Sequence, residues 1–190
     1  GCLSWLLDKT LQQITIWKDP ITLWTYVIPR APVPLAYNNF GMIHIEKRMY
    51  DEAVRLFETA LTLRPNYDDA IWNMGIAYGK KGESDKAIEL YRRRIALDST
   101  FLDAYINLGT EQLNKGMSDA AIATYRRALA LDSTFARAHY NIARALMQQN
   151  KMSDAIASYR HSLVLQPYNA DAWYNLGVAL ELQSELGAAA

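Results

Sequence analysis

The stretch AIWNMGIAYGKKGESDKAIELYRRRIALDS, residues 70–99, decides the fold of this chain. Its apolar residues recur three and four positions apart in two segments, 70–80 and 85–97, which is the spacing of one face of an α-helix. Gly82 separates the two segments. Because glycine readily adopts the left-handed conformation that ends a helix, the stretch predicts a helix–turn–helix unit.

The same unit recurs along the chain with a period of 34 residues. An alanine, an asparagine and a small residue keep their places in each first segment, while an alanine, an aromatic residue and a leucine do so in each second segment. Columns held in register over four periods predict an array of repeats rather than one globular core. We place four full repeats at 34–67, 68–101, 102–135 and 136–169, with amphipathic capping helices in 1–33 and a partial fifth repeat or C-terminal cap in 170–190.

Three columns have a direct physical interpretation. The small residue, Gly75 in the second repeat, predicts a close approach of two helices, where a larger side chain would overpack. The aromatic residue, Tyr91 in that repeat, is spaced as part of the core. The turn position is glycine in the middle two repeats and Asn150 in the fourth, whereas Arg48 departs from the rule in the first. We expect the second helices to begin near Asp51, Asp85, Asp119 and Ser153, because such residues favour a helix N-terminus.

Taken together, these motifs resemble the tetratricopeptide repeat, and residues 70–99 follow the family consensus almost throughout. The resemblance covers four repeats and the first helix of a fifth, residues 34–182. It implies an all-α fold in which antiparallel helix pairs stack into a right-handed α–α superhelix, or solenoid. It also implies a concave groove lined by the first helix of each pair.

The asparagine column is the first candidate binding feature of that groove. A side-chain amide offers one acceptor and two donors, so a row of amides can pair with the C=O and N–H groups of an extended peptide. Such a row resembles the asparagine ladder in the repeat domain of O-linked N-acetylglucosamine transferase, which implies a role in peptide binding. The alternative is structural, with each amide bonded to a neighbouring helix. The column consists of Asn39, Asn73, Asn107, Asn141 and Asn175.

Large side chains beside this column form the second candidate feature. The residue before the asparagine is aromatic in three repeats, which predicts amphipathic anchors for a partner. An isoleucine takes that place in the third repeat, and an arginine follows the asparagine by three residues in the fourth. The additional candidate peptide-binding residues are therefore Trp72, Tyr140, Tyr174, Ile106 and Arg144.

Composition argues against several other functions. Lys plus Arg and Asp plus Glu number 20 each, so the chain lacks the basic excess typical of nucleic-acid binders. It has one cysteine and three histidines, and His44, His139 and His161 fall far apart in the repeat frame, so we expect no metal site. No Ser–His–Asp or Cys–His set shares a common place. The sequence therefore predicts a non-catalytic protein without a cofactor.

The segment before the repeats suggests a membrane context. Asp19-Pro20 is a typical helix start. The segment WKDPITLW, residues 17–24, followed by NNFG, residues 38–41, resembles the stretch that precedes the repeats in O-mannosyltransferase-like polytopic membrane proteins. This resemblance implies a periplasmic or other extracytoplasmic domain, joined to the membrane only through a region absent from this chain. A second interpretation is that residues 3–28 simply form two amphipathic helices that cap the first repeat, and both interpretations can hold together. A cytoplasmic location is the alternative to the extracytoplasmic one.

The partial fifth repeat predicts exposed apolar surface at the C-terminal end of the array. A terminal repeat exposes the seam that a neighbouring repeat would otherwise cover. We expect one face of this helix to cover the fourth repeat and the other face to leave apolar surface bare, which predicts self-association. The covering face is expected to consist of Trp173, Leu176, Leu180, Leu182 and Leu186.

Three functions are consistent with these features. The leading hypothesis is a non-catalytic module for protein–protein interaction that binds an extended peptide or partner segment in the concave groove. The second is an extracytoplasmic accessory domain that presents substrate to the catalytic part of a membrane glycosyltransferase-like protein. The third is a self-assembling scaffold.

Overall fold

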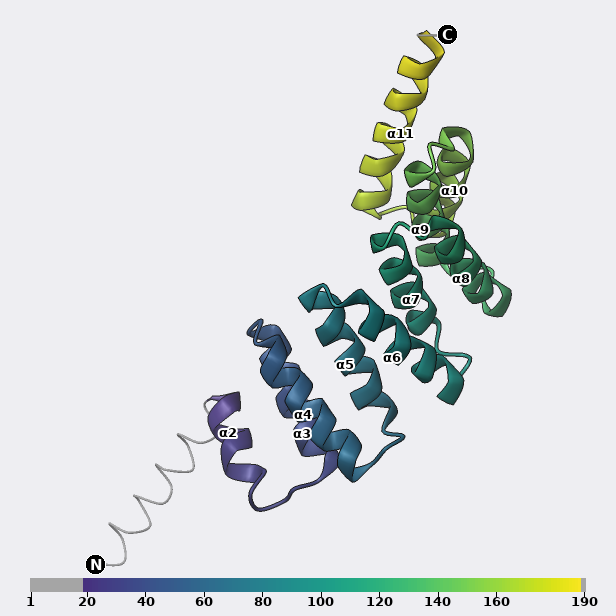
Figure 1. Ribbon diagram of the computed structural model, residues 1–190. Helices are drawn as coiled ribbons and strands as arrows, with labels where there is room; N and C mark the ends of the chain where they lie inside the picture. Colours follow the sequence, from purple (N-terminus) through teal and green to yellow (C-terminus); the bar gives the residue numbers. More distant parts are fainter. Residues whose placement is uncertain (1–18, 189–190) are drawn as a thin grey trace, which may run out of the picture. The chain divides into compact units, whose positions relative to one another are not determined.

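The computed structural model describes residues 19–188 of the chain, with side chains as far as residue 185. Every regular element in this range is an α-helix, and Figure 1 labels these helices α2 to α11. The chain divides into two compact units, residues 1–90 and residues 91–190, and the boundary falls inside α6. None of the helices in the range is long and apolar enough to span a bilayer.

The described part of unit 1 begins with a short capping helix and continues with the first repeat and most of the second. Its helices are α2 (Pro20–Val27), α3 (Pro34–Glu46), α4 (Tyr50–Leu63), α5 (Asp68–Lys81) and the first half of α6 (Ser84–Leu97). The Asp19 carboxylate accepts a 2.9 Å hydrogen bond from the Thr22 N–H and caps α2, so the predicted helix start is confirmed. In sequence order, α2 packs on α3, α3 on α4 and α4 on α5. The rest of the predicted N-terminal caps, residues 1–18, lies outside the described residues.

Unit 2 continues the same pattern of helix pairs after the second half of α6. Its further helices are α7 (Leu102–Asn114), α8 (Ser118–Leu131), α9 (Ala136–Gln148), α10 (Met152–Leu165) and α11 (Ala170–Ala188). Consecutive helices from α7 to α11 pack against each other. The predicted all-α architecture of helix–turn–helix repeats is therefore confirmed (Figure 1).

The turn between the two helices of a repeat is built in the same way each time. A residue one or two positions after the end of the first helix has a positive φ, which is 80° at Gly82 but also 59° at Arg48 and 57° at Asn150. The residue that follows donates its N–H to a carbonyl five residues back, as Glu83 does to Tyr78 at 2.9 Å. Arg48 therefore obeys the turn rule in its backbone, although a non-glycine residue spends about 1–2 kcal/mol to adopt this conformation.

The second helices begin slightly earlier than the acidic residues that were expected to mark them. The residues that flank α4 and α8, Met49 and Met117, form no side-chain cap hydrogen bond. Asp51 and Asp119 lie instead within the first turn of these helices. A carboxylate in the first turn interacts favourably with the positive end of the helix dipole, so charge rather than capping explains this column.

The aromatic column forms the core, as predicted. Phe57 and Tyr125 have no exposed surface, and Tyr91 and Tyr159 are each 2% exposed. Burial raises the pKa of Tyr159 to about 12, so this side chain stays neutral. A Cβ atom added at Gly41 would lie 2.5 Å from Cε1 of Phe57, which confirms that the small-residue column marks a close helix approach.

The predicted covering face of α11 is wrong in part. Leu176 is buried against the fourth repeat together with Ala172 and Ala179. Trp173 and Leu180, which were assigned to the same face, are 56% and 41% exposed. The correction follows from helix geometry, because positions 172, 176 and 179 share one side of a helix and position 173 lies about 100° away from 172. Leu182 is also exposed, and the side chain of Leu186 lies outside the described residues.

Candidate functional site

The five asparagines of the column all lie in the first helices of the repeats. Asn39 and Asn73 belong to α3 and α5 in unit 1. Unit 2 holds Asn107, Asn141 and Asn175 in α7, α9 and α11. Asn73 and Asn141 are buried, at 7% and 6% exposure, whereas the other three are half-buried.

Two of these amides join neighbouring repeats through the same relation in sequence. Asn73 donates a 2.9 Å hydrogen bond to Oδ1 of Asn38, which lies 35 residues earlier. Asn175 donates a 2.9 Å hydrogen bond to the hydroxyl of Tyr140, again 35 residues earlier. In both pairs the acceptor is the residue just before the column asparagine of the preceding repeat. Asn73 and Asn175 therefore each link two successive first helices inside one unit.

The hydrogen-bond partner of the amide depends on whether the residue 35 positions earlier has a polar side-chain atom. The residue 35 positions before Asn141 is Ile106, whose side chain has no polar atom. Asn141 turns to its own helix instead, where Nδ2 donates to the Arg137 carbonyl at 2.8 Å and Oδ1 accepts from Arg144 at 3.1 Å. Asn107 hydrogen-bonds the buried hydroxyl of Tyr91.

Within unit 1, Asn39 accepts a longer bond of 3.3 Å from the adjacent Asn38. Each member of the column thus has at least one partner within the chain. The half-buried amides of Asn39, Asn107 and Asn175 keep part of their surface at the solvent.

The large side chains beside the column differ in accessibility. Tyr174 is 73% exposed, and Trp72 and Tyr140 are half-buried. The Tyr140 ring packs with its centroid 5.8 Å from that of the core residue Tyr159. Ile106 is only 3% exposed, so it offers a ligand very little surface.

Arg144 is the charged member of the predicted site, and it lies close to the aromatic one. Its guanidinium carbon is 6.0 Å from the centroid of the Tyr140 ring, and its Nη1 donates to Asn141. A second arginine of the fourth repeat, Arg137, forms an ion pair with Asp103 one repeat earlier. Tyr140, Asn141 and Arg144 therefore form one cluster on α9, which the sequence predicts only as separate positions.

The histidines are placed differently from the prediction. The rings of His139 in α9 and His161 in α10 lie in contact, with centroids 4.2 Å apart, so they are not far apart as the repeat frame suggested. The two helices run antiparallel within one repeat, and this brings the start of the first beside the later part of the second. Burial lowers the pKa of His139. His44 packs edge-on against Phe40 with centroids 4.4 Å apart.

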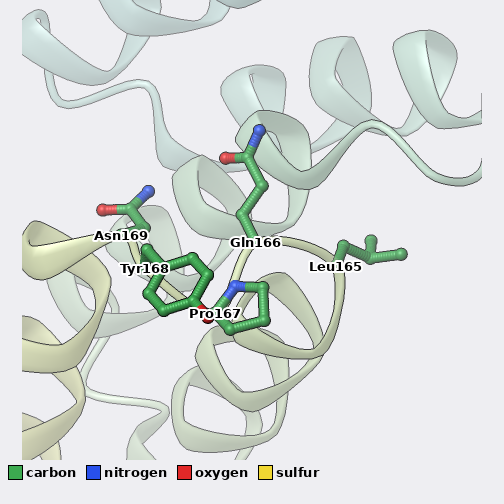
Figure 2. Close-up of a pocket in the computed structure, with 5 residues that line it drawn as sticks. All are labelled: Leu165, Gln166, Pro167, Tyr168 and Asn169. Atoms are coloured by element: carbon green, nitrogen blue, oxygen red, sulfur yellow. The ribbon is translucent and has the colours of Figure 1, made fainter.

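No metal site can be assembled from these histidines in the described part of the chain. Within that range no group of three or more His, Cys, Asp or Glu side chains is placed to hold an ion. A hollow of about 500 Å³ occurs at the turn between α10 and α11, and Figure 2 shows the five consecutive residues that surround it. Asn169 of this turn accepts a 3.0 Å hydrogen bond from the Ala172 N–H, and Tyr168 is 99% exposed. This hollow belongs to the turn itself and contains none of the predicted site residues.

The repeats match known family models along most of their length. A model described as "Tetratricopeptide repeat" matches residues 33–100, and one described as "TPR repeat" matches residues 112–150 and 143–184. The chain belongs to the tetratricopeptide repeat family. The tetratricopeptide repeat (TPR) generally mediates protein–protein interaction and is typically non-catalytic. No match was found among curated proteins.

Solved TPR structures share the fold over most of the chain. The MamA protein is 26% identical, with a TM-score of 0.69 over 80% of this chain and 82% of that one. YrrB, described as a TPR protein with an unusual peptide-binding site, is 20% identical, with a TM-score of 0.66 over 85% of this chain and 84% of that one. A thermophilic TPR protein of Thermus thermophilus is 19% identical, with a TM-score of 0.69 over 92% and 95% of the two chains. None of these matches bears on the resemblance of residues 17–41 to O-mannosyltransferase-like proteins, which stays a prediction together with the extracytoplasmic location.

Proposed function

We propose that this TPR array binds an extended peptide segment of a partner protein along its first helices. The observation that carries the proposal is the recurrence of an amide next to a large side chain at one helix position in successive repeats. Tyr174 beside Asn175 is the most accessible example, with the aromatic ring 73% exposed. In YrrB, a neighbour of the same fold, a peptide-binding site is described for that protein.

In this proposal the buried amides have a structural role, whereas the half-buried amides and the aromatic side chains contact the peptide. Asn73 and Asn141 are buried, and their amides hold helices in place, so their contribution to binding is to position neighbours. The half-buried amides of Asn39, Asn107 and Asn175 retain hydrogen-bonding capacity for a peptide backbone. Aromatic anchors supply most of the affinity, because such residues dominate the energetics of protein interfaces.

The cluster on α9 gives the site a preference in charge. Arg144 lies beside the ring of Tyr140, and a guanidinium next to an aromatic ring suits a carboxylate on the partner. Ile106 is only 3% exposed, so we assign it no direct contact with the ligand. The proposed ligand is therefore an extended segment with an acidic side chain and an apolar one.

Selection from a random peptide library on the immobilised chain tests the proposal, with affinities measured by titration calorimetry. We expect Tyr174→Ala to weaken the binding of a selected peptide by about tenfold or more, since truncation of a hot-spot anchor costs about 2 kcal/mol or more. Tyr168→Ala is the matched control, because Tyr168 is also exposed but lies in the turn before α11. Equal losses in both variants, or failure to select any peptide, would refute the proposal.

A second candidate function, self-association through α11, is supported by its bare surface. Trp173, Leu180 and Leu182 are 56%, 41% and 37% exposed on the last helix of the described range. Light scattering over a range of concentrations should show a mass that rises with concentration. Leu180→Glu with Leu182→Glu should abolish that rise, and a constant monomer mass for the unaltered chain would exclude this function.

A further inference from the structure

A second hollow, of about 510 Å³, lies inside unit 2 between the later half of α6 and the helices α7 and α8. Its walls include Ile95 of α6 and Leu108 of α7, and the side chains of Gln112 and Thr124 also face it. Leu108 is two residues from Ile106 on the same helix, so the two side chains point about 200° apart. The hollow is thus separate from the site proposed for a peptide.

Two substitutions within the repeat frame account for this hollow. In the second repeat the equivalent positions carry Tyr78 and Leu90, both large and both buried. The third repeat has Gln112 and Thr124 there, which are smaller and polar. Gln112 and Thr124 are 4% and 7% exposed. The Thr124 hydroxyl donates a 2.7 Å hydrogen bond to Oε1 of Gln112, so the buried amide oxygen has a partner.

Two arginines border the hollow and carry its charge. Arg92 of α6 and Arg127 of α8 both line it, and both are exposed. Within the described residues neither guanidinium forms an ion pair, whereas the nearby Arg94 lies 3.5 Å from the carboxylate of Asp98. Two positive charges therefore border one hollow, and neither has an acidic partner among the residues that the structure describes.

We propose that this hollow binds an oxyanion, a carboxylate or a phosphate group, between Arg92 and Arg127. A guanidinium presents a planar set of donors that matches such a group with two parallel hydrogen bonds. The apolar walls at Ile95 and Leu108 accommodate the part of the ligand that carries the group. This site goes beyond the proposed peptide site, because it shares none of its residues.

Nuclear magnetic resonance of the full chain tests the proposal with three probes. The first two are inorganic phosphate and succinate, each compared with sodium chloride at matched ionic strength to remove general screening. The third is a capped peptide with two glutamates, compared with its glutamine twin. Saturable shifts at the amides of Ile95, Leu108 and Thr124 are expected with at least one probe. A response to phosphate or succinate identifies a free anion as the ligand, and a response only to the glutamate peptide identifies an acidic side chain of a partner.

Variants separate a specific site from general attraction. Arg92→Gln with Arg127→Gln should weaken the bound probe by at least about tenfold, because charge-assisted hydrogen bonds are lost. The control is Arg126→Gln with Arg160→Gln, which removes the same charge from exposed arginines that do not line the hollow. This control should change the affinity for the probe by less than about twofold.

A second pair of substitutions closes the hollow without a change of charge. Gln112→Tyr with Thr124→Leu reproduces the pair found in the second repeat and should abolish binding by filling the space. Circular dichroism checks that this variant is folded, and if it is not, the arginine variants alone decide. The proposal is overturned if no probe gives saturable shifts, or if the control arginine pair loses as much affinity as the pair at the hollow. Either result leaves the peptide site untouched, because Tyr174 lies outside this hollow.

Discussion

A single added methyl group should have opposite effects at two equivalent glycines. Gly109 and Gly177 occupy the same position in the first helices of the third and fifth repeats. A Cβ atom at Gly109 would clash with the ring of Tyr125, which has no exposed surface and is enclosed by the core. A Cβ atom at Gly177 meets nothing within 4 Å.

The magnitudes follow from two competing effects. Replacing glycine with alanine inside a helix stabilises it by about 1 kcal/mol. Overpacking a well-filled core costs about 1–3 kcal/mol, and Tyr125 cannot swing aside as an exposed side chain would. Gly177→Ala should therefore stabilise the chain by up to about 1 kcal/mol. Gly109→Ala should be less stable than Gly177→Ala by about 1–3 kcal/mol in the free energy of unfolding.

Thermal unfolding followed by circular dichroism measures this difference. For a chain of this size, about 1 kcal/mol corresponds to about 2–4 °C in Tm. Gly41→Ala serves as a replicate in unit 1, since its Cβ atom would lie 2.5 Å from the buried ring of Phe57. The reasoning is refuted if Gly109→Ala unfolds at the same temperature as Gly177→Ala or above it.

Three further predictions concern the turn, the amide column and the histidine pair. Arg48→Gly should stabilise the chain by about 1 kcal/mol in chemical denaturation, because glycine adopts the positive φ of 59° without strain; a lower midpoint would contradict this. Asn73→Ala should destabilise it by about 1–2 kcal/mol, because Oδ1 of Asn38 loses its buried donor, and an unchanged Tm would show that this bond contributes nothing. The pKa of His139 is lowered in the folded chain, so the unfolded chain binds the proton more readily and stability should fall as the pH drops below about 6.5. His139→Gln should flatten this part of a Tm-against-pH curve, and an equally steep curve would rule out His139 as the cause.

The sequence predicted most of the fold because the same residue types recur at the same positions in each repeat, so each repeat packs in the same way. Tyr125 and Gly109 recur at the same spacing as their counterparts elsewhere, so a core role for one and a close helix approach at the other could be predicted without coordinates. The structure added that the two positions meet. The turn at Arg48 was harder, because residue preference argues against a left-handed arginine. The backbone hydrogen bonds of the turn settle its conformation instead, and the N–H of Met49 donates to His44 at 2.8 Å.

The candidate site was predicted only as a set of positions. Spacing placed Asn73 and Asn141 on the right helices but gave no measure of their burial, which depends on side chains from the preceding repeat. The alternative between a ligand role and a structural role could not be decided from the column. The residue 35 positions earlier does indicate which partner a buried amide takes: Asn38 lets Asn73 bond to the preceding repeat, whereas Ile106 leaves Asn141 to bond within its own helix.

Periodicity alone determined that this chain is an all-α array of TPR units, because a period of 34 residues repeats the local propensities and the core contacts together. Only the tertiary structure decided which side chains meet across helices. In the structure the rings of His139 and His161 are in contact, Trp173 and Leu180 are exposed to solvent, and a hollow lies beside Gln112. The physical reason is that such contacts depend on the side chains of two or three helices at once, whereas a column in the sequence records one helix position at a time.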